Sequence, residues 1–176
     1  MDLPKQIIFC VETKDTSLSD CIYIKEIVNY YFGDKITVNR IKITFIPMGG
    51  KHGFRKVEND VKEKVKLSGY KSKVIYVFDK DKNNTNHIDQ NFINDVTKYC
   101  ERNSYYIAWF VKDIESVMLG RKSANKTKDA SEFKRKNGIS LLKTNKLKNI
   151  NPQTKTSSNI LCILENILDK SSINIE

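Results

Sequence analysis

The chain has little with which to build a covalent or zinc-held framework. Its cysteines lie far apart in the sequence and form no C-x-x-C pair, and only two histidines are present. A disulfide scaffold or a zinc ribbon needs such residues in paired, regular spacings. A catalytic role for Cys10 is not expected, because it lies inside an apolar run with no plausible histidine neighbour. We therefore predict reduced, mostly buried thiols at Cys10, Cys21, Cys100 and Cys162.

Long apolar runs are also missing. No run approaches the roughly 18 residues that a membrane span needs. The first residues lead straight into a short apolar run that ends at Glu12, without the apolar core and small-residue cleavage site of a secretory signal. The sequence therefore predicts a cytoplasmic protein with no membrane association. Its 176 residues suffice for one domain with a single core.

Positive charge is abundant but unevenly distributed. The formal net charge is +10, and residues 121–155 hold eleven Lys or Arg against two acids, a net charge of +9. An AT-rich genome by itself enriches a chain in Asn, Ile and Lys, so the clustering carries more weight than the total. Clustered lysines attract the phosphate backbone of DNA or RNA. The side chains predicted to contact nucleic acid are Lys51, Arg121, Lys122, Lys126, Lys128, Lys134, Arg135 and Lys136.

Hydrophobic periodicity predicts an α/β fold for residues 1–120. Four apolar runs rich in β-formers predict strands, and apolar residues recur at helical spacing after each of the first three. Strands that alternate with helices predict a Rossmann-like parallel sheet of four strands with flanking helices. The expected strands are 6–11, 38–48, 73–78 and 105–111, with helices from Ser19 to Gly33, over 54–68 and over 88–99.

Residues 121–176 follow a different pattern. From 121 to 137 no apolar periodicity is visible, which predicts a basic, mobile loop. Two short helical patterns follow, at 139–147 and 159–168, and we expect both to pack back on the same domain.

Acidic residues follow three of the four predicted strands. In a parallel α/β sheet the ligand crevice lies beyond the carboxyl ends of the strands, so these side chains are expected to meet at one edge. The turns at the opposite edge hold no comparable cluster. The acids are Glu12 after the first strand, Asp79 and Asp81 after the third, and Asp113 and Glu115 after the fourth.

This acidic edge predicts a divalent-metal site. Mg²⁺ prefers a few carboxylates together with waters and phosphate oxygens, and two aspartates at i and i+2 after a strand suit such an ion. The ion would polarise a phosphoryl oxygen or activate a water. If the first and third strands are neighbours, Glu12 lies opposite the Asp79 and Asp81 pair as a further ligand or a general base.

Structural interpretations of the same residues remain open. Asp79 or Asp81 alone fits a helix cap or a solvated loop residue, and Asp113 fits the N-cap of a short following helix. The glycine-rich segment 49–53, with Lys51, fits either a phosphate-binding loop or a plain turn. His52 fits either a surface loop residue or a proton carrier.

The glutamate that ends the first strand and the Asp-x-Asp that ends the third resemble the Toprim domain. The layout is most similar to small Toprim proteins of the OLD-family and RloB-like phage-defence group. The resemblance implies that Glu12 is a general acid/base or metal ligand and that Asp79 and Asp81 bind Mg²⁺. Two positions depart from the family pattern: Thr13 replaces a glycine, and Asn83 replaces the third acid of the topoisomerase version.

The leading hypothesis is a nuclease that uses Mg²⁺ or Mn²⁺ to hydrolyse phosphodiesters of DNA or RNA, with residues 121–155 neutralising the backbone. The resemblance also implies a phage-defence or toxin-like effector beside an ATPase partner. One alternative is a non-catalytic module that binds nucleic acid or a partner protein. Another is a small-molecule metallophosphatase, which normally has its Asp-x-Asp after an early strand.

Overall fold

A computed structural model describes residues 3–15, 19–80, 87–150 and 156–168, except for the side chains of residues 87–89. The element order is β1 Gln6–Val11, α1 Ser19–Val38, β2 Lys42–Pro47, η1 Lys51–Arg55, α2 Glu58–Leu67, β3 Ser72–Lys80, α3 His87–Asn103, β4 Tyr106–Val111, α4 Ile114–Leu119, α5 Lys126–Arg135, η2 Gly138–Leu141, η3 Thr144–Lys146 and α6 Ile160–Leu168, where η marks a 3₁₀ helix.

The strands form one parallel sheet in the order β2-β1-β3-β4. Gln6 of β1 pairs with Lys42 of β2 on one side and with Ser72 of β3 on the other. Residues 7–11 are fully buried, as expected of a strand covered on both faces. The predicted four-stranded Rossmann-like α/β fold is therefore confirmed.

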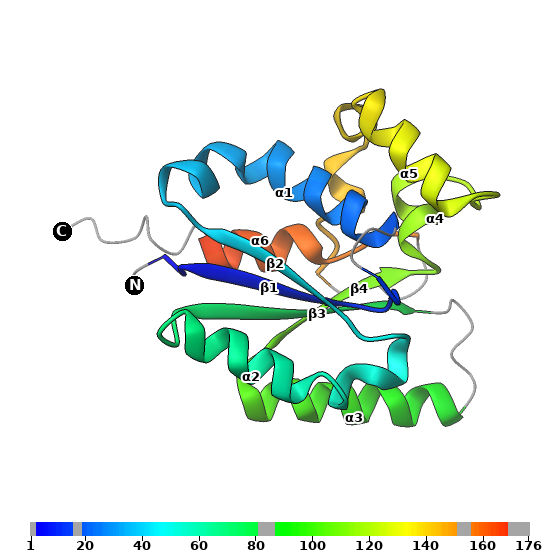
Figure 1. Ribbon diagram of the computed structural model, residues 1–176. Coiled ribbons are helices and arrows are strands. Elements are labelled where there is room, and N and C mark those ends of the chain that lie inside the picture. Colours follow the sequence, from blue (N-terminus) through cyan, green and yellow to red (C-terminus); the bar gives the residue numbers. More distant parts are fainter. Residues whose placement is uncertain (1–2, 16–18, 81–86, 151–155, 169–176) are drawn as a thin grey trace.

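Helices cover both faces of the sheet (Figure 1). Ile7 and Phe9 belong to a core cluster shared with α1, α4, α5 and α6, whereas Ile8 and Cys10 belong to a cluster shared with α2 and α3. This split follows from the alternation of side chains along a strand. The uninterrupted apolar run of β1 thus supplies both cores.

The strand order places a topological switch point between β1 and β3. The chain leaves β1 through α1 to reach β2 on one side, and it later continues from β3 through α3 to β4 on the other. In open α/β sheets such a point leaves a crevice beyond the carboxyl ends of the strands, where ligands bind. Glu12 directly follows β1, and Asp79 is the penultimate residue of β3.

Two boundaries differ from the sequence prediction. Helix α1 continues through Gly33 to Val38 instead of ending at the glycine, and β2 begins at Lys42 rather than at residue 38. Ile27 and Val28 before Gly33 and Phe32 beside it are buried against the sheet. Tertiary packing therefore outweighs the modest helix penalty of one glycine.

The predicted loop at 121–137 is wrong, because helix α5 occupies its central part. The Asn125 side chain caps this helix by accepting a hydrogen bond of 3.1 Å from the backbone N–H of Lys128. Ala130 and Phe133 are its buried residues, and Phe133 meets Tyr23 of α1 edge to face with ring centroids 5.3 Å apart. Two buried apolar residues in ten are too few to produce a recognisable helical periodicity in the sequence. The helix is stabilised instead by its packing against α1.

The segment before α6 covers the outer edge of β4. The Asn159 side chain accepts a hydrogen bond of 2.8 Å from the N–H of Trp109 and donates one of 3.1 Å to the carbonyl of Ile107. Ser158 forms an antiparallel bridge with Phe110. This contact satisfies backbone groups that an edge strand otherwise exposes.

In the described part of the chain, no helix is long and apolar enough to cross a bilayer.

Candidate functional site

Glu12 and Asp79 lie side by side at the switch point. Cys10 of β1 pairs with Tyr76 of β3, so the residues that leave these two strands emerge together. The backbone N–H of Asp79 donates a hydrogen bond of 3.0 Å to Oε1 of Glu12. The condition on which the sequence hypothesis depended, that the first and third strands are neighbours, is therefore met.

The start of α4 anchors the side chain of Asp79. The backbone N–H of Ile114, at the start of α4, donates a hydrogen bond of 3.1 Å to Oδ1 of Asp79. Each of the two acids thus has one carboxylate oxygen oriented by a main-chain donor from a neighbouring element. Such bonds fix the direction of a side chain more firmly than contacts between two mobile side chains.

Asp79 has a strongly perturbed carboxyl group. Its pKa is raised well above the usual value, first by burial and then by the negative charges of Glu12, Asp20 and Glu115. Burial and like charges both disfavour the ionised form, and a bound cation reverses that preference. The carboxyl group of Asp79 is therefore held toward its protonated form, which a bound cation would oppose as Lys126 does in part.

Asp20 is a member of this cluster that the sequence analysis missed. Its pKa is raised to about 6 by burial and by the charge of Glu115. The residue lies in the first turn of α1, which follows β1 and therefore begins at the carboxyl edge of the sheet. The available signal was this position, directly after Ser19, at which the first helix is predicted to begin.

The two acids after β4 play different parts. The Asp113 side chain accepts a hydrogen bond of 2.6 Å from the N–H of Ser116, so the helix-cap interpretation is confirmed for Asp113. Glu115 is 1% exposed, and its two oxygens accept hydrogen bonds from Ser19 Oγ at 3.0 Å and Lys126 Nζ at 3.2 Å. Both oxygens of Glu115 are thus engaged within the protein. Asp81 lies outside the described residues.

The donor set suits a hard cation that keeps several waters. Across the described residues, no group of three or more His, Cys, Asp or Glu is arranged to hold a metal ion. Glu12 and Asp79 supply oxygen donors from the ends of two adjacent strands, and burial, followed by the negative charge of Glu12, raises the pKa of Asp79. Mg²⁺ is commonly held by one or two carboxylates together with waters and substrate phosphates, so these residues fit it.

The glycine-rich segment after β2 is a tight turn. Gly49 and Gly50 have φ values of 69° and 117°, which favour glycine. The N–H of Gly49 donates to the carbonyl of Thr13, and the N–H of Gly53 donates to that of Gly50. These two donors are directed inside the protein. Lys51, in contrast, has its ammonium 5.5 Å from the ring centroid of Phe92.

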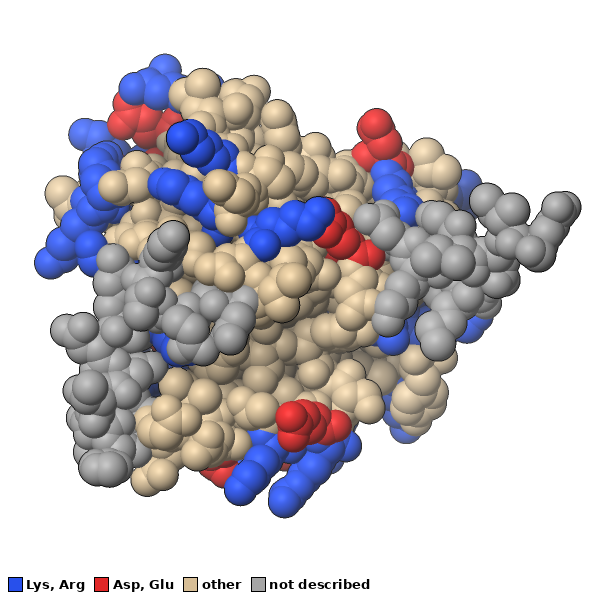
Figure 2. Space-filling model, turned by 180° about the vertical axis from the view of Figure 1, so that it is seen from behind, with Lys and Arg blue, Asp and Glu red and all other residues tan. Residues whose placement is uncertain are grey.

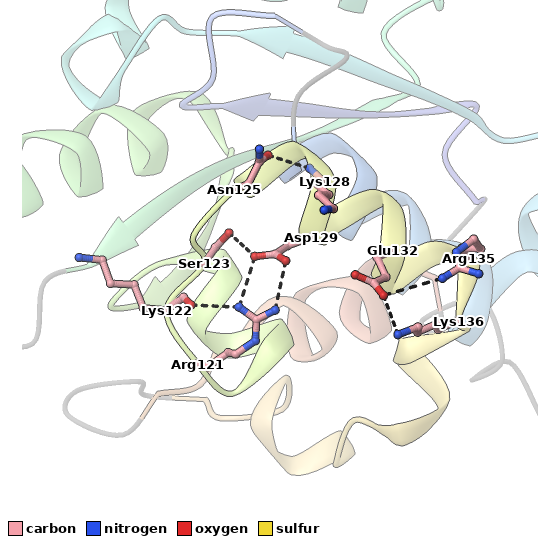
Figure 3. A network of polar contacts seen from close by, with 9 residues as sticks. All are labelled: Arg121, Lys122, Ser123, Asn125, Lys128, Asp129, Glu132, Arg135 and Lys136. Carbon is pink, nitrogen blue, oxygen red and sulfur yellow. Dashed lines mark hydrogen bonds and ion pairs between the residues drawn. The ribbon is translucent and has the colours of Figure 1, made fainter.

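Apart from Lys51, the predicted basic residues lie in α5 or next to it in the sequence, and Figure 2 shows a concentration of Lys and Arg at the upper left. Acidic neighbours engage some of them, as Figure 3 illustrates. Arg121 pairs with Asp129 at 3.1 Å, and Arg135 and Lys136 both pair with Glu132. Lys126 reaches away from this network to Glu115, so it links the basic helix to the acidic edge.

Three of the predicted basic residues are exposed and carry a positive charge that no described acidic residue pairs with. Lys122, Lys128 and Lys134 are exposed, and none has an ion-pair partner among the residues that the structure describes. In Figure 3 the Lys122 side chain extends away from the ion pairs. Exposed lysines without acidic partners are the ones best able to neutralise phosphates.

The four cysteines are free, as predicted. Cys10, Cys21 and Cys100 are buried, and Cys162 is half-buried. Burial raises the pKa of Cys21 to about 11 and that of Cys100 to about 12. Thiols with such pKa values stay protonated at neutral pH and are poor nucleophiles.

Comparison of the chain with protein-family models, curated proteins and solved structures finds no match. The Toprim resemblance therefore remains a hypothesis that rests on Glu12 and on the Asp79 and Asp81 pair.

Proposed function

We propose that the protein is a divalent-metal-dependent nuclease whose site is the acidic edge between β1 and β3. The observation that carries the proposal is the adjacency of Glu12 and Asp79 at the switch point, joined by the 3.0 Å hydrogen bond from Asp79 N–H to Glu12 Oε1. A pair of carboxylates at the ligand-binding position of an open α/β sheet is a suitable site for metal-assisted phosphate chemistry.

In this proposal Glu12 and Asp79 hold Mg²⁺ or Mn²⁺, with Asp81 as the further ligand that the sequence predicts. The bound ion would polarise the scissile phosphate and lower the pKa of the attacking water. The N–H groups of Asp79 and Ile114 keep the two carboxylates in place while substrate binds. Glu12 can in addition accept a proton from the water.

A nucleic-acid substrate is favoured over a small phosphorylated molecule by the charge around α5. Lys122, Lys128 and Lys134 provide exposed positive charge, and Lys126 connects the same helix to the acidic edge through Glu115. A backbone held along α5 by such contacts would extend toward Glu12 and Asp79. The Toprim resemblance adds a defence role with an ATPase partner, which co-purification from the native host would test.

Cleavage assays on labelled single- and double-stranded DNA and RNA, with Mg²⁺, Mn²⁺ or EDTA, test the proposal. We expect metal-dependent cutting that falls at least a hundredfold in Asp79→Asn, since the ion loses one of its few ligands. The matched control is Asp34→Asn, an exposed acid near the far end of α1. Equal cutting by both variants, or cutting in EDTA, contradicts the proposal.

The alternatives make different predictions in the same assays. A non-catalytic module binds nucleic acid equally well with Glu12→Gln and in EDTA, and it cuts nothing. A small-molecule phosphatase hydrolyses p-nitrophenyl phosphate but not oligonucleotides, and its activity has little salt dependence.

A further inference from the structure

A recess lies on the face of the sheet that α2 and α3 cover, near the carboxyl ends of the strands. Its cavity volume is about 490 Å³, within the range of small-ligand sites. The lining comes from η1 and from the first half of α3, which Figure 1 shows next to each other below the carboxyl ends of the strands. The residues that matter here are His52, Phe54, Asn91, Phe92, Asn94 and Lys98.

Aromatic rings form the inner part of this recess. Phe54 and Phe92 are 4% and 8% exposed, and their ring centroids are 6.0 Å apart. His52 is exposed and meets Phe92 at an interplanar angle of 73°, with centroids 5.3 Å apart. Because the two rings are not stacked on each other, a planar group can still stack on the imidazole. Aromatic side chains at nucleic-acid sites hold bases in this way.

Polar groups at the rim suit a nucleobase that carries a phosphate. Asn91 and Asn94 are exposed, and an amide can offer a donor and an acceptor to a base edge. Oδ1 of Asn94 accepts a hydrogen bond of 3.2 Å from the Gln90 amide, so Asn94 offers chiefly its NH₂ donors. Asp95 is the acid that lines the recess, and Arg55 compensates it through contacts of 2.9 and 3.0 Å. Lys98 adds positive charge to the lining, and the ammonium of Lys51 lies 5.5 Å from the ring centroid of Phe92. The recess is thus aromatic inside and cationic at its rim.

We propose that this recess binds one unpaired nucleotide of a single-stranded nucleic acid. The choice of ligand class rests on the proposed function. Helix α5 lies on one side of the sheet, and α3, whose first half lines the recess, lies on the other (Figure 1). A strand that contacts both the α5 lysines and the recess would therefore cross the edge that holds Glu12 and Asp79. A base inside a duplex is stacked and cannot enter, which makes single strands or frayed ends the preferred substrate.

Binding measured in EDTA tests this site independently of metal and cleavage. Fluorescence anisotropy would compare labelled single-stranded DNA and RNA 12-mers with the matching duplexes. For His52→Ala we expect about tenfold weaker binding of the single strand and little change for the duplex, as loss of one stacked base predicts. Asn91→Ala should act in the same direction. Asn39→Ala, directly after the end of α1, is the control with unchanged affinity.

Oligonucleotides with one abasic position, moved along the strand, identify the contact itself. At one position the missing base should weaken binding to the wild type about tenfold but leave binding to His52→Ala unchanged, because that variant has already lost the stack. The site is overturned if His52→Ala binds single strands as the wild type does, if it loses affinity for duplexes equally, or if the wild type binds no single strand. If His52→Ala weakens single-strand binding but the wild type shows no metal-dependent cutting, the nuclease proposal is rejected and the nucleotide site is retained.

Discussion

The Lys126 ammonium lies 3.2 Å from Oε2 of Glu115, a side chain that is 1% exposed, and this contact joins the basic helix α5 to the acidic edge of the sheet. The other oxygen of Glu115 accepts from Ser19 Oγ, at the start of α1. Three elements that are distant in the sequence therefore meet at one buried carboxylate. Glu115 therefore links α1, α4 and α5 beside the candidate site.

Removing Lys126 should destabilise the protein. Lys126→Met leaves a buried charge with only the Ser19 hydroxyl, and we expect the unfolding free energy to fall by about 1 kcal/mol, limited by the exposure of the lysine. Urea denaturation measures the change. Adding Glu115→Gln to Lys126→Met should recover part of the loss, since position 115 then carries no unpaired buried charge. A Lys126→Met variant as stable as the exposed control Lys128→Met would contradict this role.

Stability in EDTA should rise as the pH falls from 7 toward 4. Asp20 has a pKa of about 6 in the folded protein, against 3.8 in a solvated chain, so the folded state binds the proton more tightly and protonation stabilises it. The raised pKa of Asp79 acts in the same direction. Asp129, whose pKa is lowered to about 2 chiefly by Arg121, has the opposite effect only below about pH 4.

Urea unfolding at pH 7, 6 and 5 measures this slope for the wild type and for Asp20→Asn. The variant should show the smaller increase, because it lacks one of the perturbed carboxyl groups. An unfolding free energy that decreases from pH 7 to pH 5 in the wild type would show that these carboxyl groups are not buried together.

The contact between Asn159 and the edge strand should stabilise β4. Asn159→Ala removes both hydrogen bonds to the strand and leaves the Trp109 N–H and the Ile107 carbonyl without this partner. We expect a loss of about 1–3 kcal/mol in unfolding free energy and faster hydrogen exchange at the Trp109 amide. Asn145→Ala, in the exposed η3 turn, serves as the control. Unchanged exchange at Trp109 would contradict the contact.

The exposed lysines of α5 should determine the salt dependence of nucleic-acid binding. Each phosphate contact contributes about one unit to the slope of log K against log salt concentration. Lys128→Gln and Lys134→Gln should therefore each lower that slope by about one, whereas Arg135→Gln, whose cation pairs with Glu132, should lower it less. If all three substitutions lower the slope equally, pairing with Glu132 does not determine which residues contact phosphates.

The sequence predicts the sheet well because its signals are local. Residues 7–11 and 74–78 are short apolar runs with β-forming residues, and both are buried strands in the structure. The carboxyl-edge rule then places Glu12 and Asp79 together once the strand order is known. The cap at Asp113 was likewise visible from the residues that follow it.

Features that depend on tertiary contacts were not predictable. Helix α5 has only Ala130 and Phe133 as buried residues, and its stability comes from packing on α1. The grouping of Asp20 with Glu115 joins residues almost a hundred positions apart, and no spacing in the sequence signals it. The engagement of Lys126 with Glu115 similarly appears only when the helix is placed.

Titration with Mn²⁺ followed by electron paramagnetic resonance tests most directly whether the acidic edge is a divalent-cation site. We predict saturable binding to the wild type and to Asp34→Asn, at least tenfold weaker binding to Glu12→Gln and Asp79→Asn, and competition by Mg²⁺. Equal Mn²⁺ binding by all four proteins, or none by the wild type, would contradict the assignment of Glu12 and Asp79 as metal ligands.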